Sequence, residues 1–179
     1  MNKYRENLLE KHRKSDWDVT HGCFTVARMV KRFNVKIMAE IGVGLGHNAS
    51  EVLALNQVKK YYMIDSWASE DNYLKIKNNF HDECVKIIRE ESMAAINKVD
   101  DESLDFVYID TGHYSIRHTL EYIQGWYGKL RIGGILLGNG YNHPKLSGVK
   151  QAVHRIFSKE CINVNMSKDS NYWVFKEGE

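Results

Sequence analysis

The chain contains 179 residues, of which 43% are hydrophobic and 27% are charged, so it is long enough to bury a core as one domain spanning residues 1–179. A net charge of only +2 argues against nucleic acid as the main partner, and no apolar run reaches membrane-spanning length. Three widely separated cysteines and a charged N-terminal segment lead us to expect a cytoplasmic protein without disulfides.

The N-terminal segment carries two amphipathic patterns. Apolar spacing predicts a short surface helix over residues 4–14 and a second helix over residues 23–33. A polar, glycine-ended loop joins them. We therefore expect residues 1–35 to form a helical cap ahead of the main fold.

From residue 36 onward, strand patterns alternate with helical patterns. The predicted strands are 36–41, 60–65, 84–88, 104–110 and 133–138, and the predicted helices between them are 47–57, 70–80, 92–98 and 115–128. Alternation at this spacing indicates right-handed crossovers. It predicts an α/β fold, a doubly wound, Rossmann-like sheet that is mostly parallel and carries helices on both faces.

The pattern changes after Gly138. A polar loop leads to a predicted helix over 147–158, and two strand-like runs, 161–166 and 172–176, are joined by a polar turn. A tight turn between adjacent strands predicts an antiparallel hairpin at the edge of the sheet. The aromatic part of this hairpin could pair across a homodimer.

The first predicted strand leads into a turn that contains Gly42, Gly44 and Gly46 and precedes a predicted helix. Glycines permit positive φ and let a ligand contact the main chain, and the helix presents unpaired N–H groups. The second strand ends in Asp65, where a carboxylate can accept hydrogen bonds from both ribose hydroxyls. Together these features predict a nucleoside-binding pocket rather than a purely structural turn.

Polar residues also follow the third and fourth predicted strands. Ser92 can serve as a helix N-cap and as a hydrogen-bonding group for an adenine edge. Asp110, His113 and Tyr114 follow the fourth strand and should lie beside the glycine turn. Asp110 could hold a metal, orient a ligand amine or act as a base. His113 is either a base near the substrate or a structural helix cap.

The fifth predicted strand is flanked by further candidates. Gly133 and Gly134 are expected to form the turn into this strand. The loop that follows the strand should lie on the same edge of the sheet as the glycine turn. Its residues Asn139, Tyr141 and His143 are therefore candidates for contact with a substrate.

In this order the motifs resemble those of class I S-adenosylmethionine-dependent methyltransferases. The matching motifs, within residues 36–176, are E-I-G-V-G-L-G, M-I-D-S-W, a serine, S-L-D-F-V-Y-I-D-T-G-H-Y and L-R-I-G-G-I-L-L-G. The chain is most similar to a small bacterial group with I-D-G-D-H and G-D-D-Y type motifs, which has catechol-O-methyltransferase-like relatives. The resemblance implies a seven-stranded sheet whose last strand is antiparallel and inserted beside strand five, with N-terminal helices acting as a substrate lid.

The resemblance also implies S-adenosylmethionine as cofactor, S-adenosylhomocysteine as product and a small-molecule methyl acceptor. It assigns Glu40, Gly42, Gly44 and Gly46 to the methionine moiety, Asp65, Ser66 and Trp67 to the ribose and adenine, Ser92 to the adenine, and Asp110 to the sulfonium end.

Two departures from the related group bear on metal use. Gly112 stands where that group has a second acid, and Asn139 with Gly140 stands where metal-dependent relatives carry an acidic pair. A magnesium site needs several oxygen ligands, usually carboxylates. Asp110 and Asn139 alone supply few oxygen ligands. We therefore expect the methyl group to be transferred to an oxygen or nitrogen without a metal ion, with Mg²⁺ dependence as the alternative.

Without a metal, the proton of the acceptor must pass to a side chain. The candidates are His113, His143 and Asp110. We place His113 first because it directly follows a strand end.

Two other functions fit part of the pattern. An NAD-dependent reductase would use a glycine turn and a ribose-binding acid, but this turn reads G-x-G-x-G rather than G-x-G-x-x-G. A catalytically degenerate protein that binds the cofactor for assembly or regulation would also lack the acids at 112 and 140.

Overall fold

The computed structural model describes residues 26–143, 147–159, 162–167 and 170–178. The predicted helix over residues 4–14 lies outside this part of the chain. So do residues 23–25 of the second predicted helix and most of the predicted N-terminal cap.

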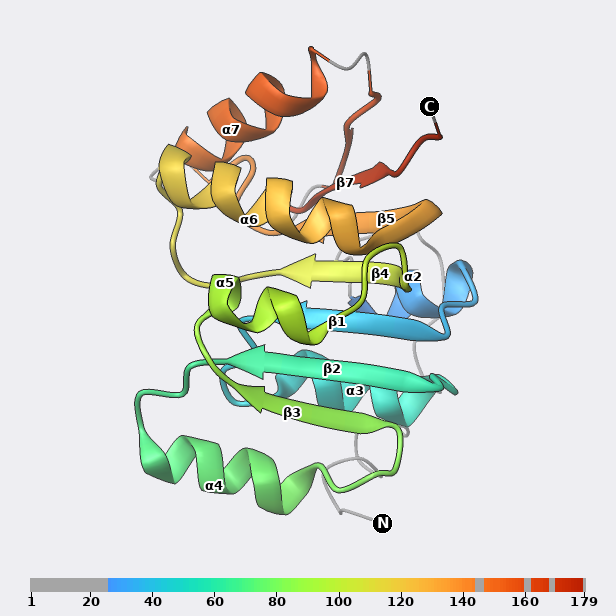
Figure 1. Cartoon of the computed structure of the whole chain (residues 1–179), viewed down its shortest axis with the longest axis vertical. Helices are drawn as coiled ribbons and strands as arrows, with labels where there is room; N and C mark the ends of the chain where they lie inside the picture. The colour runs from blue at the N-terminus through green and yellow to red at the C-terminus, as the bar shows by residue number, and fades with distance from the viewer. Residues whose placement is uncertain (1–25, 144–146, 160–161, 168–169, 179) are drawn as a thin grey trace.

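A seven-stranded mixed sheet in the order β3-β2-β1-β4-β5-β7-β6 forms the centre of the fold (Figure 1). Its strands are β1 (Ile37–Ile41), β2 (Lys60–Asp65), β3 (Val85–Arg89), β4 (Leu104–Ile109), β5 (Leu130–Gly138), β6 (Asn165–Met166) and β7 (Tyr172–Phe175). The strands from β1 to β5 pair in parallel, whereas β7 pairs antiparallel with both β5 and β6. The predicted Rossmann-like sheet with its C-terminal antiparallel hairpin is confirmed.

Helices cover both faces of the sheet (Figure 1). One layer contains α2 (Val26–Arg32), α3 (His47–Leu55) and α4 (Glu70–Asn79); the other contains α5 (Ser92–Ala95), the 3₁₀ helix η1 (Ile96–Lys98), α6 (Ile116–Lys129) and α7 (Ser147–Phe157). Successive side chains of β1 point to opposite faces of the sheet, and both faces are apolar. Met38 packs against the first helix layer, whereas Ala39 and Ile41 pack against the second. None of the described helices combines the length and apolarity that crossing a bilayer requires.

Helix α6 is the main support of the second layer. Its buried residues Thr119, Tyr122, Ile123 and Trp126 recur at helical spacing. Ser115 caps its N-terminus by accepting a hydrogen bond from the N–H of His118 at 3.2 Å. This helix therefore reaches from the strand ends, where Ser115 lies, back across the sheet.

Strand β5 differs from the prediction at its start. It begins at Leu130 rather than at residue 133, and its pairing with β4 shifts register, so that Leu104 faces Leu130 but Phe106 faces Ile135. The extra residues form a bulge in which Gly133 has φ +77°. Gly133 and Gly134 therefore lie within the strand and not in a turn before it, and both form backbone hydrogen bonds with Lys176.

The remaining differences are small. Strand β6 is only two residues long, although residues 161–166 were predicted, and residue 161 lies outside the described part. Ser92 is the first residue of α5, while Glu91 occupies the N-cap position without a side-chain cap. The expected N-cap role of Ser92 is therefore wrong.

The junction of β5 and β7 leads to a stability prediction. A Cβ on Gly138 would lie 2.4 Å from the ring of Tyr172, which is fully buried. We expect Gly138→Ala to lower the free energy of unfolding by roughly 1–3 kcal/mol through overpacking. In Gly128→Ala, the control in α6, the Cβ would enter open space, and stability should rise by about 0.5–1 kcal/mol.

Urea unfolding of both variants measures these changes. A Gly138→Ala variant as stable as the parent would contradict the tight packing of β5 against β7.

Candidate functional site

The carboxyl ends of the parallel strands meet at one edge of the sheet, where two hollows adjoin. The central hollow is lined by Ile41, Gly42, Ile64, Asp65, Ser66, Glu91, Ser92, Thr111, His113 and Tyr122. The lateral hollow is lined by Ile109, Asp110, Thr111, His113, Tyr114, Thr119, Tyr122, Ile123, Asn139, Val149 and Tyr172. Thr111, His113 and Tyr122 line both hollows and so stand between them.

The turn after β1 requires glycine at two of its three glycine positions, because a Cβ atom there would collide with neighbouring atoms. Gly42 has φ +90°, and a Cβ there would lie 2.2 Å from the carbonyl oxygen of Asp110. Gly46, at φ +77°, lies so close to Phe80 that a Cβ would be 2.5 Å from its ring. Gly44 is exposed with φ +56° and faces open space. The first and last glycines are required for packing, and the middle one leaves main chain accessible.

Asp65 ties the glycine turn to the end of β2. One carboxylate oxygen accepts a hydrogen bond from the N–H of Gly44 at 2.8 Å, and the other accepts one from the N–H of Trp67 at 2.8 Å. A carboxylate has about four lone-pair positions, so each oxygen retains capacity for a further donor. The expected position of Asp65 beside the turn agrees with this geometry.

Trp67 supports the turn from beneath. Its indole N–H donates to the carbonyl of Gly44 at 2.8 Å, its backbone has φ +38°, and its side chain is 3% exposed. Arg89 donates to the Trp67 carbonyl at 3.1 Å and stacks on Tyr73. Trp67 is thus close to the turn but absent from the lining of both hollows, which differs from the direct ligand contact implied by the resemblance.

Glu40 is also behind the lining. Its carboxyl is fully buried and accepts hydrogen bonds from the Tyr61 hydroxyl at 2.5 Å and the Asn48 amide at 3.2 Å. Burial raises the pKa of Glu40 to about 7, the two hydrogen bonds oppose this rise, and the charges of Asp110 and Asp65 add to it. The nearby carboxylates therefore act electrostatically on a group that holds a proton near neutral pH.

Ser92 is one of the residues that line the central hollow. Its hydroxyl oxygen accepts a hydrogen bond from the indole N–H of Trp126 at 2.9 Å. This bond fixes the start of α5 against α6. Ser66 and Glu91, the neighbours of Asp65 and Ser92 in the chain, line the same hollow and are exposed.

Asp110 collects three neutral hydrogen-bond donors. The hydroxyls of Tyr108 and Tyr114 donate to its two oxygens at 3.1 Å each, and the amide of Asn139 donates at 3.2 Å. Burial and the charge of Asp110 raise the pKa of Tyr114 to about 12 and raise that of Tyr108 further. Both phenols therefore stay protonated, and they hold the carboxylate in place.

The histidine candidates separate in the structure. His113 is exposed and lies at the border of the two hollows, with its backbone N–H donating to Thr111 Oγ1 at 3.3 Å. His143 is exposed in the loop after β5 and lines neither hollow. Tyr141 is buried, and its hydroxyl pairs with His154 Nε2 at 2.7 Å rather than pointing into a hollow.

Negative charge dominates the two hollows. Their linings contain Asp65, Glu91 and Asp110, and no lysine or arginine is among the described residues that form them. Sequence reasoning missed Tyr122, because its place in the amphipathic pattern of α6 is that of a core residue. It also missed Glu91, although the adjacent Ser92 was a signal for it.

A magnesium ion needs several oxygen ligands, usually carboxylates. No group of three or more His, Cys, Asp or Glu side chains placed for metal binding occurs in the described part of the chain. The side-chain oxygen of Asn139 accepts a hydrogen bond from the N–H of Gly140 at 2.6 Å. Among the described residues, Asp110 and Asn139 thus offer few free oxygen atoms here, whereas a magnesium site needs several oxygen ligands.

The buried carboxyl of Glu40 leads to a pH prediction. Its pKa is raised above the ordinary 4.5, so the folded chain binds the proton more tightly than the unfolded chain. Glu40 therefore lowers the free energy of unfolding as pH rises from about 4.5 to 7, by up to about 3 kcal/mol. A glutamine side chain at this position cannot ionise, so Glu40→Gln should gain stability over the parent as pH rises through this window.

Urea unfolding at about pH 5 and about pH 8 measures this difference. Glu83→Gln, at an exposed position, is the control and should show no such gain. An equal difference between Glu40→Gln and the parent at both pH values would contradict a raised pKa.

One protein family matches this chain. The family described as methyltransferase domain matches residues 39–141. A comparison with curated proteins found no match. The chain thus carries the motif order of that family over more than half its length, from β1 to the loop after β5.

Solved structures share the fold at low identity. O-methyltransferase TomG from Streptomyces achromogenes, involved in tomaymycin synthesis and solved with SAM, has a TM-score of 0.67 at 12% identity, covering 99% of this chain and 91% of its own. An O-methyltransferase from Bacillus cereus solved with SAH has a TM-score of 0.66 at 14% identity, and the match covers 98% of this chain and 92% of that protein. A Staphylococcus aureus protein provisionally described as a caffeoyl-CoA O-methyltransferase has a TM-score of 0.71 at 14% identity, and the match covers 99% of this chain and 100% of that protein. By its family match, this chain belongs to the methyltransferase domain family.

Proposed function

We propose that this protein transfers a methyl group from S-adenosylmethionine to an oxygen or nitrogen of a small molecule, without a metal ion. The central hollow would hold the cofactor and the lateral hollow the acceptor. The observation that carries this proposal is the combination of an accessible glycine turn with a cleft lined by carboxylates.

The charge of the cleft distinguishes between cofactors. S-adenosylmethionine carries a positive sulfonium and an ammonium group, which the carboxylates of Asp65, Glu91 and Asp110 would attract. A nicotinamide dinucleotide would bring a doubly negative pyrophosphate to the same turn, where no lysine or arginine is among the described lining residues to balance it. This contrast favours the sulfonium cofactor over NAD(H).

Individual contacts follow from the geometry. Asp65 would accept the ribose hydroxyls with the lone pairs left by Gly44 and Trp67, and Ser92 and Ser66 would face the adenine. The main chain of residues 42–46 would hold the methionine part. Trp67 would act behind the lining by supporting the turn, and Glu40 would add negative charge only as it ionises above about pH 7.

The position of His113 suggests how the acceptor loses its proton. The bound cofactor would supply an electrophilic methyl carbon: a lone pair of the acceptor oxygen or nitrogen would bond to it in line as the carbon–sulfur bond breaks, with S-adenosylhomocysteine as the leaving group. His113 lies between the two hollows, where an acceptor hydroxyl or amine in the lateral hollow would be within reach. Asp110 already accepts three hydrogen bonds, which leave its two oxygens fewer free lone pairs for a proton from the acceptor.

A cofactor-binding protein without catalysis is the alternative. It would share the central hollow, since Gly112 and Gly140 affect only the acceptor side. It predicts binding of S-adenosylhomocysteine with no methylated product. Cofactor binding and methyl transfer therefore have to be measured separately.

The first prediction concerns cofactor affinity. Asp65→Asn replaces a carboxylate oxygen with an amide donor, so it loses the charge and one acceptor for the ribose. We expect the dissociation constant for S-adenosylhomocysteine, measured by calorimetry, to rise roughly tenfold or more. Asp71→Asn, an exposed position on α4, is the control and should bind as the parent does. Unchanged affinity of a folded Asp65→Asn variant would rule out the ribose contact.

The second prediction concerns proton removal. We expect His113→Ala to lower the rate of methyl transfer from radiolabelled S-adenosylmethionine to an accepted phenol or amine roughly 100-fold. Cofactor affinity should change little, because His113 acts on the acceptor. His81→Ala, an exposed control, should keep the parental rate. If the His113→Ala variant turns over at the parental rate, another group removes the proton.

A further inference from the structure

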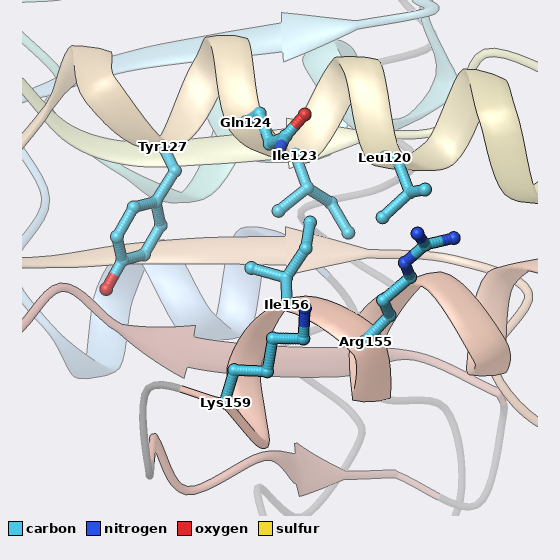
Figure 2. A pocket seen from close by; sticks show the side chains of 7 residues that line it. All are labelled: Leu120, Ile123, Gln124, Tyr127, Arg155, Ile156 and Lys159. Carbon is cyan, nitrogen blue, oxygen red and sulfur yellow. The ribbon is translucent and has the colours of Figure 1, made fainter.

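A second concave region lies apart from the strand ends, between α6 and α7 (Figure 2). It is a groove with a volume of about 480 Å³, which falls in the range of small-molecule pockets. Leu120, Ile123 and Tyr127 contribute from α6, and Ile156 contributes from α7. Of these residues only Ile123 also borders the lateral hollow, so the groove is a separate site.

The groove carries two cations on one side. Arg155 lies in the last turn of α7 and Lys159 in the turn that directly follows the helix, and Figure 2 shows both charged groups on the side of α7 that faces α6. In the part of the chain that the structure describes, neither forms an ion pair, and no acid lines the groove. Cations near the end of α7 also complement its dipole, which accounts for their place along the helix but not for an apolar hollow beneath them.

The combination of an apolar floor and two adjacent cations defines the ligand chemistry. A bare phosphate would leave the exposed parts of Leu120 and Ile156 uncovered. A neutral hydrocarbon would leave Arg155 and Lys159 without a counter-charge. An anion joined to an apolar chain satisfies both, because a carboxylate can lie between the two cations while the chain covers the floor.

The length of the groove limits the size of this ligand. The residues from Leu120 to Tyr127 span about 10 Å of helix α6, at about 1.5 Å per residue. A medium-length alkyl chain has this extent, whereas a partner helix would need a longer and wider surface. We propose that the groove between α6 and α7 binds a free amphiphilic carboxylate of medium chain length.

Decanoate is a suitable probe, with decanol as its uncharged match. Full-length ¹⁵N-labelled protein is titrated with each, below the concentration at which micelles form, and amide shifts are followed. We expect saturable shifts confined to α6, α7 and the turn at residues 158–159 for decanoate, and at least roughly tenfold weaker binding of decanol.

The double variant Arg155→Gln, Lys159→Gln should weaken decanoate binding roughly tenfold. The control Lys150→Gln removes a cation from α7 outside the groove and should bind as the parent does. A second variant, Leu120→Gln, removes part of the floor and should also weaken binding, with thermal unfolding used to confirm that each variant is folded.

Four results would overturn the proposal. Three concern affinity: the absence of saturable decanoate binding, equal binding of decanoate and decanol, and equal binding of decanoate by the parent and the folded double variant. The fourth is a set of shifts located outside α6 and residues 147–159.

Discussion

The close approach of Gly42 to the main chain of Asp110 is the constraint on which the site depends. Because Gly42 has no Cβ, the end of β1 can lie directly against the end of β4, where a side chain would be 2.2 Å from a carbonyl oxygen. This contact brings the glycine turn beside Asp110 and the residues that follow it. The central and lateral hollows therefore adjoin, which a two-substrate transfer requires.

Asp65 gives the turn its shape on the other side. A single carboxylate binds the N–H groups of Gly44 and Trp67, and Trp67 returns a bond to the Gly44 carbonyl. In our proposal the same carboxylate also receives the ribose, so the group that orders the turn also selects the ligand. Preorganisation of this kind reduces the entropy lost on binding. The carboxylates around the cleft then favour a cationic cofactor.

Much of the fold could be predicted because it rests on periodic patterns. The strands from β1 to β4 and the helices between them follow from hydrophobic spacing, and the position of Asp65 and Asp110 follows from the rule that strand ends meet at one edge. The start of β5 was predicted wrongly because a bulge, set by pairing with β4 and Lys176, has no local periodic signal.

The directions of the side chains in the site could not be predicted from the spacing of apolar residues in the sequence. Trp67 and Glu40 both lie next to the turn in the structure, yet packing directs the indole beneath Gly44 and buries the carboxyl against Tyr61. Tyr122 reaches the hollows from the middle of a helix, where the amphipathic pattern indicates only burial. Such positions depend on tertiary contacts between segments far apart in the chain.

A crystal structure of the complex with S-adenosylhomocysteine would test the central claim most directly. The account predicts that the ribose hydroxyls hydrogen-bond to Asp65, the adenine lies beside Ser92, and the homocysteine lies along residues 42–46 with its sulfur facing the lateral hollow. A nucleoside bound elsewhere on the protein, or one whose ribose makes no contact with Asp65, would contradict it.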